Sequence, residues 1–135
     1  MRVIASFAIA LVLCACANDS PVSPGAHLAF GEWGGDRVQV VASDSLTEVN
    51  VGCTGGNFAG NITLGATGNF VVNGSFAPYA GPLASSLMPA QMSGEVSGNT
   101  ITFAVAVYDT IQKKIISIAP ATAVFGHHAN LVVCP

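Results

Sequence analysis

Charged side chains are scarce in this chain of 135 residues, and basic ones most of all. Only 8% of the residues are charged, and four are basic: Arg2, Arg37, Lys113 and Lys114. A protein that binds nucleic acid needs a stripe of cations that neutralises successive phosphates. Four basic residues, two of them neighbours, form no such stripe. The composition therefore argues against nucleic acid as a partner.

Long hydrophobic runs are also lacking, apart from one at the N-terminus. Residues 3–13 are almost wholly apolar and follow the basic Arg2. The uncharged stretch ends near Asp19, short of the roughly 20 residues that span a bilayer. This arrangement is typical of a secretory signal rather than of a permanent membrane helix. With the leader subtracted, the chain has room for one domain.

The leader ends at two cysteines. The sequence Leu13-Cys14-Ala15-Cys16 resembles the lipobox of bacterial lipoproteins, with an aliphatic residue three positions before the acceptor and a small residue just before it. The resemblance implies that residues 1–15 are a lipoprotein signal peptide. It also implies that Cys16 is the lipidation site, with a diacylglycerol thioether and an N-acyl chain such as palmitate. Two alternatives are Cys14 as the acceptor, which the large Leu13 disfavours, and ordinary cleavage after Ala15 or Ala17 without a lipid.

Residues 16–26 predict a lipidated N-terminus and a flexible tether. They have no hydrophobic period, and Pro21 and Pro24 oppose a helix. In Gram-negative lipoproteins an Asp directly after the acceptor cysteine retains the protein in the inner membrane, whereas this chain has Ala17. The resemblance thus implies an exported protein, held by its lipid on the periplasmic face of the outer membrane if the organism has one.

Residues 27–135 predict one all-β domain, a small antiparallel barrel or sandwich of about eight strands. Short segments rich in β-branched and aromatic residues recur every ten to twelve residues, with turn residues between them and no helical period. Turns are expected at 43–45 and 55–57, and a long loop at 77–90, which contains three prolines. The expected strands cover 37–42, 47–53, 60–64, 69–76, 91–96, 100–108, 113–119, 122–125 and 129–134.

Alternation along these strands predicts a packed interior. An eight-stranded barrel is only just wide enough for its own side chains or one small ligand. The residues expected to point inward are of medium or large size, so they should fill it. They are Val38, Val40, Val49, Val51, Phe70, Val72, Phe76, Ile101, Phe103, Val105 and Val107. Ala42, Thr47 and Cys53 are expected on the same inward faces.

Two cysteines remain after the leader and the anchor are assigned. Cys53 and Cys134 are the only ones in residues 27–135. In an exported protein such a pair most simply forms a disulfide. We expect it to close the domain by tying the C-terminal strand to the strand over 47–53.

No set of residues predicts catalysis, a metal site or a cofactor. His127 and His128 are adjacent, so on an extended chain they point to opposite faces and cannot share an ion, even with His27 nearby. No Gly-x-Ser-x-Gly elbow and no free cysteine supplies a nucleophile. The carboxylates that might pair for glycoside chemistry have no evident cleft. They are Glu32, Asp36, Glu48 and Glu95.

Two family resemblances bear on the fold. The chain resembles a group of uncharacterised bacterial secreted proteins and lipoproteins in its Trp33-Gly34-Gly35 motif, its Ser93-Gly94-x-Val96-x-Gly98 hairpin and the positions of Cys53 and Cys134. That group carries no assigned activity, so the resemblance implies a β domain only. Gly31-x-Trp33 also resembles the first strand of lipocalins, which carry small apolar ligands, but two glycines follow Trp33 and a Thr-Asp-Tyr motif is absent.

Two functional hypotheses follow. The first is a lipid-anchored, non-enzymatic module that recognises another component of the cell envelope, since the sequence shows an anchor and a tether but no catalytic set. The alternative is a calycin-like carrier that encloses a small apolar ligand, which the strand count and Gly31-x-Trp33 favour. Trp33 with Phe30 is a candidate ligand platform, although a lone Trp in a small β domain usually belongs to the core. Whether the interior is filled or hollow separates the two hypotheses.

Overall fold

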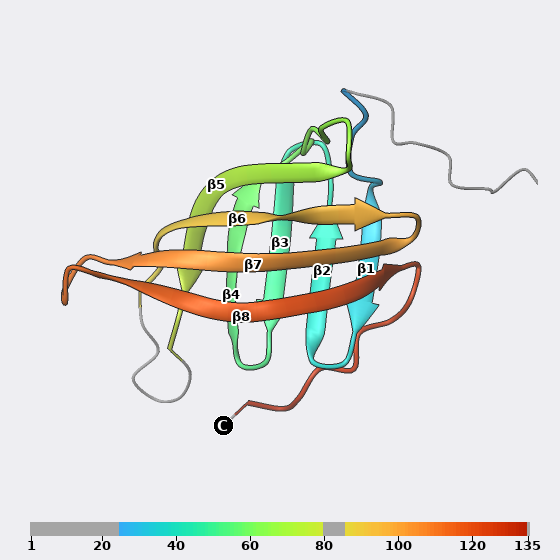
Figure 1. Ribbon diagram of the computed structural model, residues 1–135. Coiled ribbons are helices and arrows are strands. Elements are labelled where there is room, and N and C mark those ends of the chain that lie inside the picture. The colour runs from blue at the N-terminus through green and yellow to red at the C-terminus, as the bar shows by residue number, and fades with distance from the viewer. Residues whose placement is uncertain (1–24, 80–85, 135) are drawn as a thin grey trace, which may run out of the picture.

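The computed structural model describes residues 25–79 and 86–134. Within these residues, eight antiparallel strands form a closed barrel (Figure 1). The prediction of an all-β fold with about eight strands is therefore confirmed, and the barrel replaces the sandwich. The strands are β1 (Gly31–Gly35), β2 (Val38–Ala42), β3 (Leu46–Val51), β4 (Thr54–Ala59), β5 (Asn69–Ala77), β6 (Met88–Ser97), β7 (Thr100–Asp109) and β8 (Lys114–Phe125).

Three predictions lie outside the described residues. They are the signal peptide over 1–15, the lipidated Cys16 and most of the tether, because the description begins at Gly25. The part of the chain that is described holds no helix long and apolar enough to cross a membrane.

Each strand pairs with its neighbours in the sequence, so the barrel is an up-and-down meander. The seam that closes it is short. β8 pairs with β1 only at two positions, Trp33 with Phe125 and Gly34 with Val124. The pairing of β6 with β7 covers eight positions by comparison. The closure of the barrel thus depends on few ladder contacts and on what packs around them.

The barrel interior is lined by its own apolar side chains. The residues predicted to point inward from β2, β5 and β7 are buried, apart from Val72, which is partly buried against the core. Val51 of β3 is also partly buried there. Large side chains that the alternation did not identify complete the core. These are Leu28, Trp33, Phe58, Ile62, Leu64, Met88, Met92 and Val96.

Glycine and phenylalanine face each other across three pairs of strands. Gly56 of β4 lies opposite Phe76 of β5, and Gly74 of β5 lies opposite Phe58 of β4. Gly94 of β6 lies between Phe70 of β5 and Phe103 of β7. Glycine in a strand allows a close approach of backbones, and an aromatic neighbour covers the missing side chain. These pairs let the sheet bend tightly while its interior stays filled.

The turn predicted from the two glycines at residues 55–57 was wrong. They were predicted to form a turn, but they lie inside β4. Gly56 is needed there because a Cβ atom would lie 2.1 Å from the carbonyl oxygen of Ser75. The strand predicted over 60–64 is absent from the described chain, where this stretch forms only an isolated bridge between His27 and Thr63.

The prediction of a long loop over 77–90 extends too far toward the C-terminus. β6 begins at Met88, whose side chain is buried together with that of Ala90. Pro89 lies between them on the exposed outer face, opposite Ser75. The proline suggested a loop, yet its neighbours continue the inward alternation of β6.

The C-terminal strands were also divided wrongly. The segments predicted over 113–119 and 122–125 form one strand, β8, which contains Pro120. Its register against β7 shifts between Phe103 and Val105, opposite Pro120, and an irregularity of this kind tolerates a residue without an N–H donor. Residues 129–134 form no strand and make only an isolated bridge, Asp36 to Asn130. Instead, residues 31–35 supply a strand that alternation did not identify.

The two ends of the barrel differ. The N-terminal end carries residues 25–30 and the connections β2–β3, β4–β5 and β6–β7, whereas the hairpin end carries the other four connections (Figure 1). At the N-terminal end, the backbone of Leu28 donates to Ile62 at 2.8 Å, and that of Leu64 donates to Ala26 at 2.6 Å. The side chains of Leu28, Ile62 and Leu64 are buried, so these segments cover the core at this end.

The glycine–phenylalanine pairs yield a test of the fold. A Cβ atom at Gly74 would lie 2.2 Å from the carbonyl oxygen of Asn57 and 2.6 Å from Cα of Phe58. Gly74→Ala should therefore lower the free energy of unfolding by about 1–3 kcal/mol, because two strand backbones must separate. Urea unfolding measures this change. Ser93→Ala on an exposed strand position is the control, with an expected change within about 0.5 kcal/mol. Equal stability of both variants would refute the argument.

Candidate functional site

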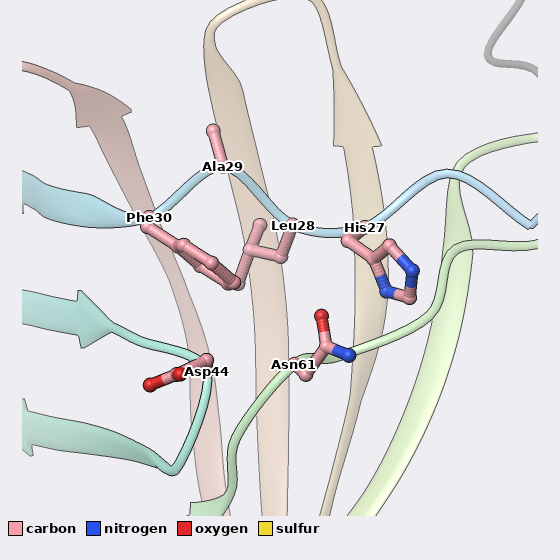
Figure 2. A pocket seen from close by; sticks show the side chains of 6 residues that line it. All are labelled: His27, Leu28, Ala29, Phe30, Asp44 and Asn61. Carbon is pink, nitrogen blue, oxygen red and sulfur yellow. The ribbon is translucent and has the colours of Figure 1, made fainter.

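An open groove lies at the N-terminal end of the barrel. It has a volume of about 550 Å³ and is lined by the chain that enters β1, by the β2–β3 turn and by the chain that leaves β4. Figure 2 shows its lining side chains: His27, Leu28, Ala29, Phe30, Asp44 and Asn61. Ligand pockets usually occupy about 300–1,000 Å³, so the groove has a suitable size for a small group.

Backbone contacts hold the three walls of the groove together. His27 forms a bridge with Thr63, and Leu28 is anchored in the core. The backbone N–H of Asn61 donates to the carbonyl of Ser43 at 2.8 Å, which joins the third wall to the β2–β3 turn. Asn61 adopts a positive φ of 53°, a conformation that asparagine tolerates better than most residues. The groove is therefore preformed by the fold.

The groove combines an apolar middle with polar ends. In Figure 2 the side chains of Phe30 and Leu28 lie next to each other, with His27 and Asn61 on one side and Asp44 on the other. Phe30 is 52% exposed although it is a large aromatic residue. This arrangement can hold an apolar group and orient it by hydrogen bonds to imidazole, amide or carboxylate groups.

Trp33 belongs to the core, as predicted, and from there it holds the chain segment that lines the groove. Its ring is buried and lies 5.1 Å from the ring of Phe125. Its indole Nε1 donates to the carbonyl oxygen of Ala29 at 3.1 Å. Since Ala29 precedes Phe30, this bond fixes the chain that presents Phe30 to solvent. Trp33 and Phe30 therefore form no joint platform, and Phe30 alone is accessible.

Glu32, considered from the sequence only as a member of a carboxylate pair, has a structural role: it joins two segments of the chain. Its Oε1 accepts hydrogen bonds from Gln39 at 3.0 Å and from the backbone of Ala129 at 3.2 Å, and its Oε2 lies 3.2 Å from Nδ1 of His128. The bonds from Gln39 and Ala129 hold the pKa of Glu32 below its usual range. The carboxylate thereby ties the segment after β8 to β1. The sequence held no signal for this role, because Ala129 and Glu32 are 97 residues apart and the strand over 31–35 was not predicted.

We call residues 126–134 the C-terminal strap. A Cβ atom at Gly34 would lie 2.2 Å from the carbonyl oxygen of His127, so the strap lies directly on the outer face of β1. Farther along, Asn130 donates to Gly35 at 3.0 Å and accepts from the backbone of Arg37 at 2.9 Å. The strap thus extends the short seam between β1 and β8.

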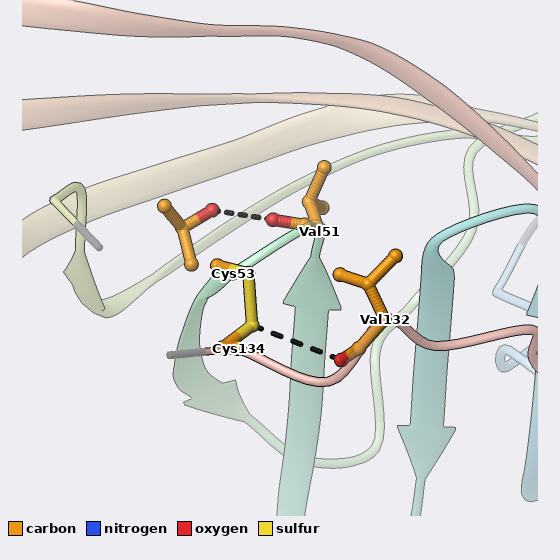
Figure 3. The surroundings of a disulfide bond; sticks show 5 residues. Val51, Cys53, Val132 and Cys134 are labelled. Carbon is orange, nitrogen blue, oxygen red and sulfur yellow. Dashed lines mark hydrogen bonds between the residues drawn. A yellow bond between two sulfur atoms is a disulfide. The ribbon is translucent and has the colours of Figure 1, made fainter. Parts of the chain in front are cut away.

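The disulfide between Cys53 and Cys134 fastens the end of the strap (Figure 3). The two Cα atoms lie 5.6 Å apart. The predicted pairing is confirmed, but the expected connection of two strands is wrong. Cys53 lies in the turn between β3 and β4 rather than on an inward strand face, and Cys134 lies in the strap.

Within the described residues, the histidines and carboxylates that the sequence singled out form no single cluster, although Glu32 and His128 approach each other to 3.2 Å. His27 lines the groove, whereas His127 and His128 are exposed in the strap. Glu48 lies on β3 and Glu95 on β6, while Asp36 is next to the β1–β2 turn. Among residues 25–79 and 86–134, no three His, Cys, Asp or Glu side chains gather in a way that would hold a metal ion.

Comparison of the chain with protein-family models, with curated proteins and with solved structures finds no match. The site is therefore interpreted from its own geometry.

Removal of the disulfide should destabilise the barrel strongly. The bond closes a loop with a sequence separation of 81 residues, for which the chain-entropy model gives up to about 4.5 kcal/mol. Urea unfolding of the variant with both Cys53→Ser and Cys134→Ser should show this loss, and the reduced wild-type protein should match it. An unchanged unfolding midpoint in both samples would contradict the role assigned to the strap.

Proposed function

We propose that this chain is an exported lipoprotein, anchored through a lipid on Cys16 and followed by a short tether. The leader and the lipobox-like sequence support this proposal. The disulfide between Cys53 and Cys134 supports export, since such bonds persist mainly in oxidising compartments. In a Gram-negative organism, the absence of Asp at position 17 favours the outer membrane, with the domain in the periplasm.

We infer that the domain is a non-enzymatic binding module of the cell envelope. One observation carries this inference: side chains from all eight strands are packed against each other inside the barrel. A binding partner must then be recognised on the outside. The groove around Phe30 offers an apolar contact and three polar groups for this purpose.

The carrier hypothesis requires a hollow interior. In this barrel, Phe58, Phe76 and Met92 occupy the inside and are almost completely buried. At the N-terminal end, Leu28 and Ile62 cover the core. Because an eight-stranded barrel has little room beyond its own side chains, these residues favour the binding module over the carrier.

The groove lies at the end of the barrel from which the chain leads to the anchor. Gly25 is nine positions after Cys16, and an extended chain covers at most about 3.3–3.6 Å per residue. The proposed anchor therefore keeps the groove within about 30 Å of the bilayer surface. A component that presents an apolar group close to that surface is the expected partner.

Lipid attachment is tested by metabolic labelling with a fatty-acid analogue. Cys16→Ser should abolish the label and leave the precursor uncleaved, because the acceptor thiol is gone. Cys14→Ser serves as the matched control and should be labelled like the wild type. Equal labelling of wild type and Cys16→Ser would rule out the proposed anchor.

Recognition through the groove is tested by a photoreactive phenylalanine analogue at position 30, expressed in native envelopes. Irradiation should yield a discrete adduct, because Phe30 points into the groove and is half exposed. The same analogue at Val71, an exposed position on the outer face of β5, should give no such adduct. Identical patterns at both positions would argue against a binding role for the groove.

A further inference from the structure

The hairpin between β7 and β8 extends beyond the rest of the barrel and carries exposed apolar side chains (Figure 1). Ile111 in its turn is 81% exposed, and Ile115 at the start of β8 is 62% exposed. Tyr108, which pairs with Ile115 across the two strands, is 43% exposed. Large aliphatic residues gathered at a protruding tip usually mark a contact surface.

The same tip carries two cations next to these apolar residues. Lys113 and Lys114 are the only lysines of the chain, and both are exposed. The formal net charge of the chain is −3, so the tip has the opposite sign to the whole. An anionic surface would therefore attract this protein by the hairpin and repel most of the rest.

The one acidic residue of the hairpin, Asp109, pairs with Lys114 across the two strands, but its carboxylate is buried and engaged in the turn. Asp109 is only 1% exposed, and its Oδ1 accepts hydrogen bonds from the backbone of Ile111 at 2.8 Å and of Gln112 at 2.9 Å. Its Oδ2 accepts from the hydroxyl of Tyr79 at 2.9 Å. The carboxylate thus faces the turn and fixes its shape, so that the tip loses little conformational entropy when it binds.

We propose that the β7–β8 hairpin docks on the surface of an anionic phospholipid bilayer. Ile111 enters the boundary of the acyl chains, and Ile115 and Tyr108 lie at the level of the headgroups. Lys113 and Lys114 meet the lipid phosphates, while their aliphatic stems remain in apolar contact. The contact lies at the hairpin end of the barrel, away from the N-terminal segment, and does not require a lipid on Cys16.

A bilayer fits this tip better than an acidic protein does. A stable protein interface covers about 800 Å² on each partner and needs a complementary shape. A hairpin tip is narrow and convex, so it offers a protein little area. A fluid bilayer adapts to the tip, and it supplies both phosphate groups and an apolar layer at matching depths.

The two lysines provide a site-specific test. The full chain is placed on vesicles of phosphatidylcholine alone, or with about one quarter phosphatidylglycerol to supply anionic headgroups. Acetylation of Lys113 and Lys114 by a water-soluble ester is then followed by peptide mass spectrometry. We expect the rate to fall about fivefold on the anionic vesicles, and to recover in about 0.5 M salt, which screens the attraction.

A matched pair of variants separates insertion from simple attraction. Ile111→Ser should lose most of the protection, whereas Val71→Ser, which removes another exposed aliphatic residue, on β5, should keep it. Both positions are exposed, so neither change should disturb the fold. Equal acetylation rates on the two kinds of vesicle would overturn the proposal. Protection that appears only when envelope proteins are added would also overturn it, and would point to an acidic protein instead.

Discussion

The structure depends on the pairs in which a strand glycine faces a phenylalanine. An eight-stranded sheet closes only if its strands coil strongly, and this brings the backbones of β4 and β5, and of β6 and β7, into close approach. Gly56, Gly74 and Gly94 permit that approach, since a Cβ atom at any of them would lie between 2.1 and 2.2 Å from a backbone oxygen. The facing phenylalanines then fill the space inside. The bend that closes the barrel thus also brings these phenylalanines into its core.

The seam between β1 and β8, where the sheet closes on itself, needs additional support. β1 is only five residues long and meets β8 at two positions. The strap adds what the ladder lacks, because it lies on Gly34 and bonds to Glu32 through Ala129. Its Asn130 also exchanges backbone hydrogen bonds with Gly35 and Arg37, and the strap ends in a covalent bond to Cys53. The disulfide is therefore part of the closure of the barrel rather than an addition to a sheet that is complete without it.

The sequence was most informative where local pattern and tertiary role agree. Val38 to Ala42 and Thr100 to Val107 alternate with one face inward, and both appear as strands in the structure. The prediction failed at Gly55–Gly56 and at Pro120, because these residues signal turns locally but serve here as close-contact and bulge positions set by the neighbouring strand. The candidate site was harder still. Phe30 was noted beside Trp33, but Asp44 and Asn61 join it only through backbone bonds between segments distant in sequence.

The packed core of the barrel separates the chemistry of its two ends. At the N-terminal end, the groove presents Phe30 between neutral or acidic groups, and the chain leads from there toward Cys16. At the hairpin end lie Arg37, Lys113 and Lys114, which are all the basic residues in the described part of the chain. Because the basic residues lie at one end of the barrel, the protein has a charge asymmetry along the barrel axis. An anionic surface would contact the hairpin end, and an apolar partner would contact the groove at the N-terminal end. The barrel wall lies between these two contacts, so it fixes their distance and their relative orientation.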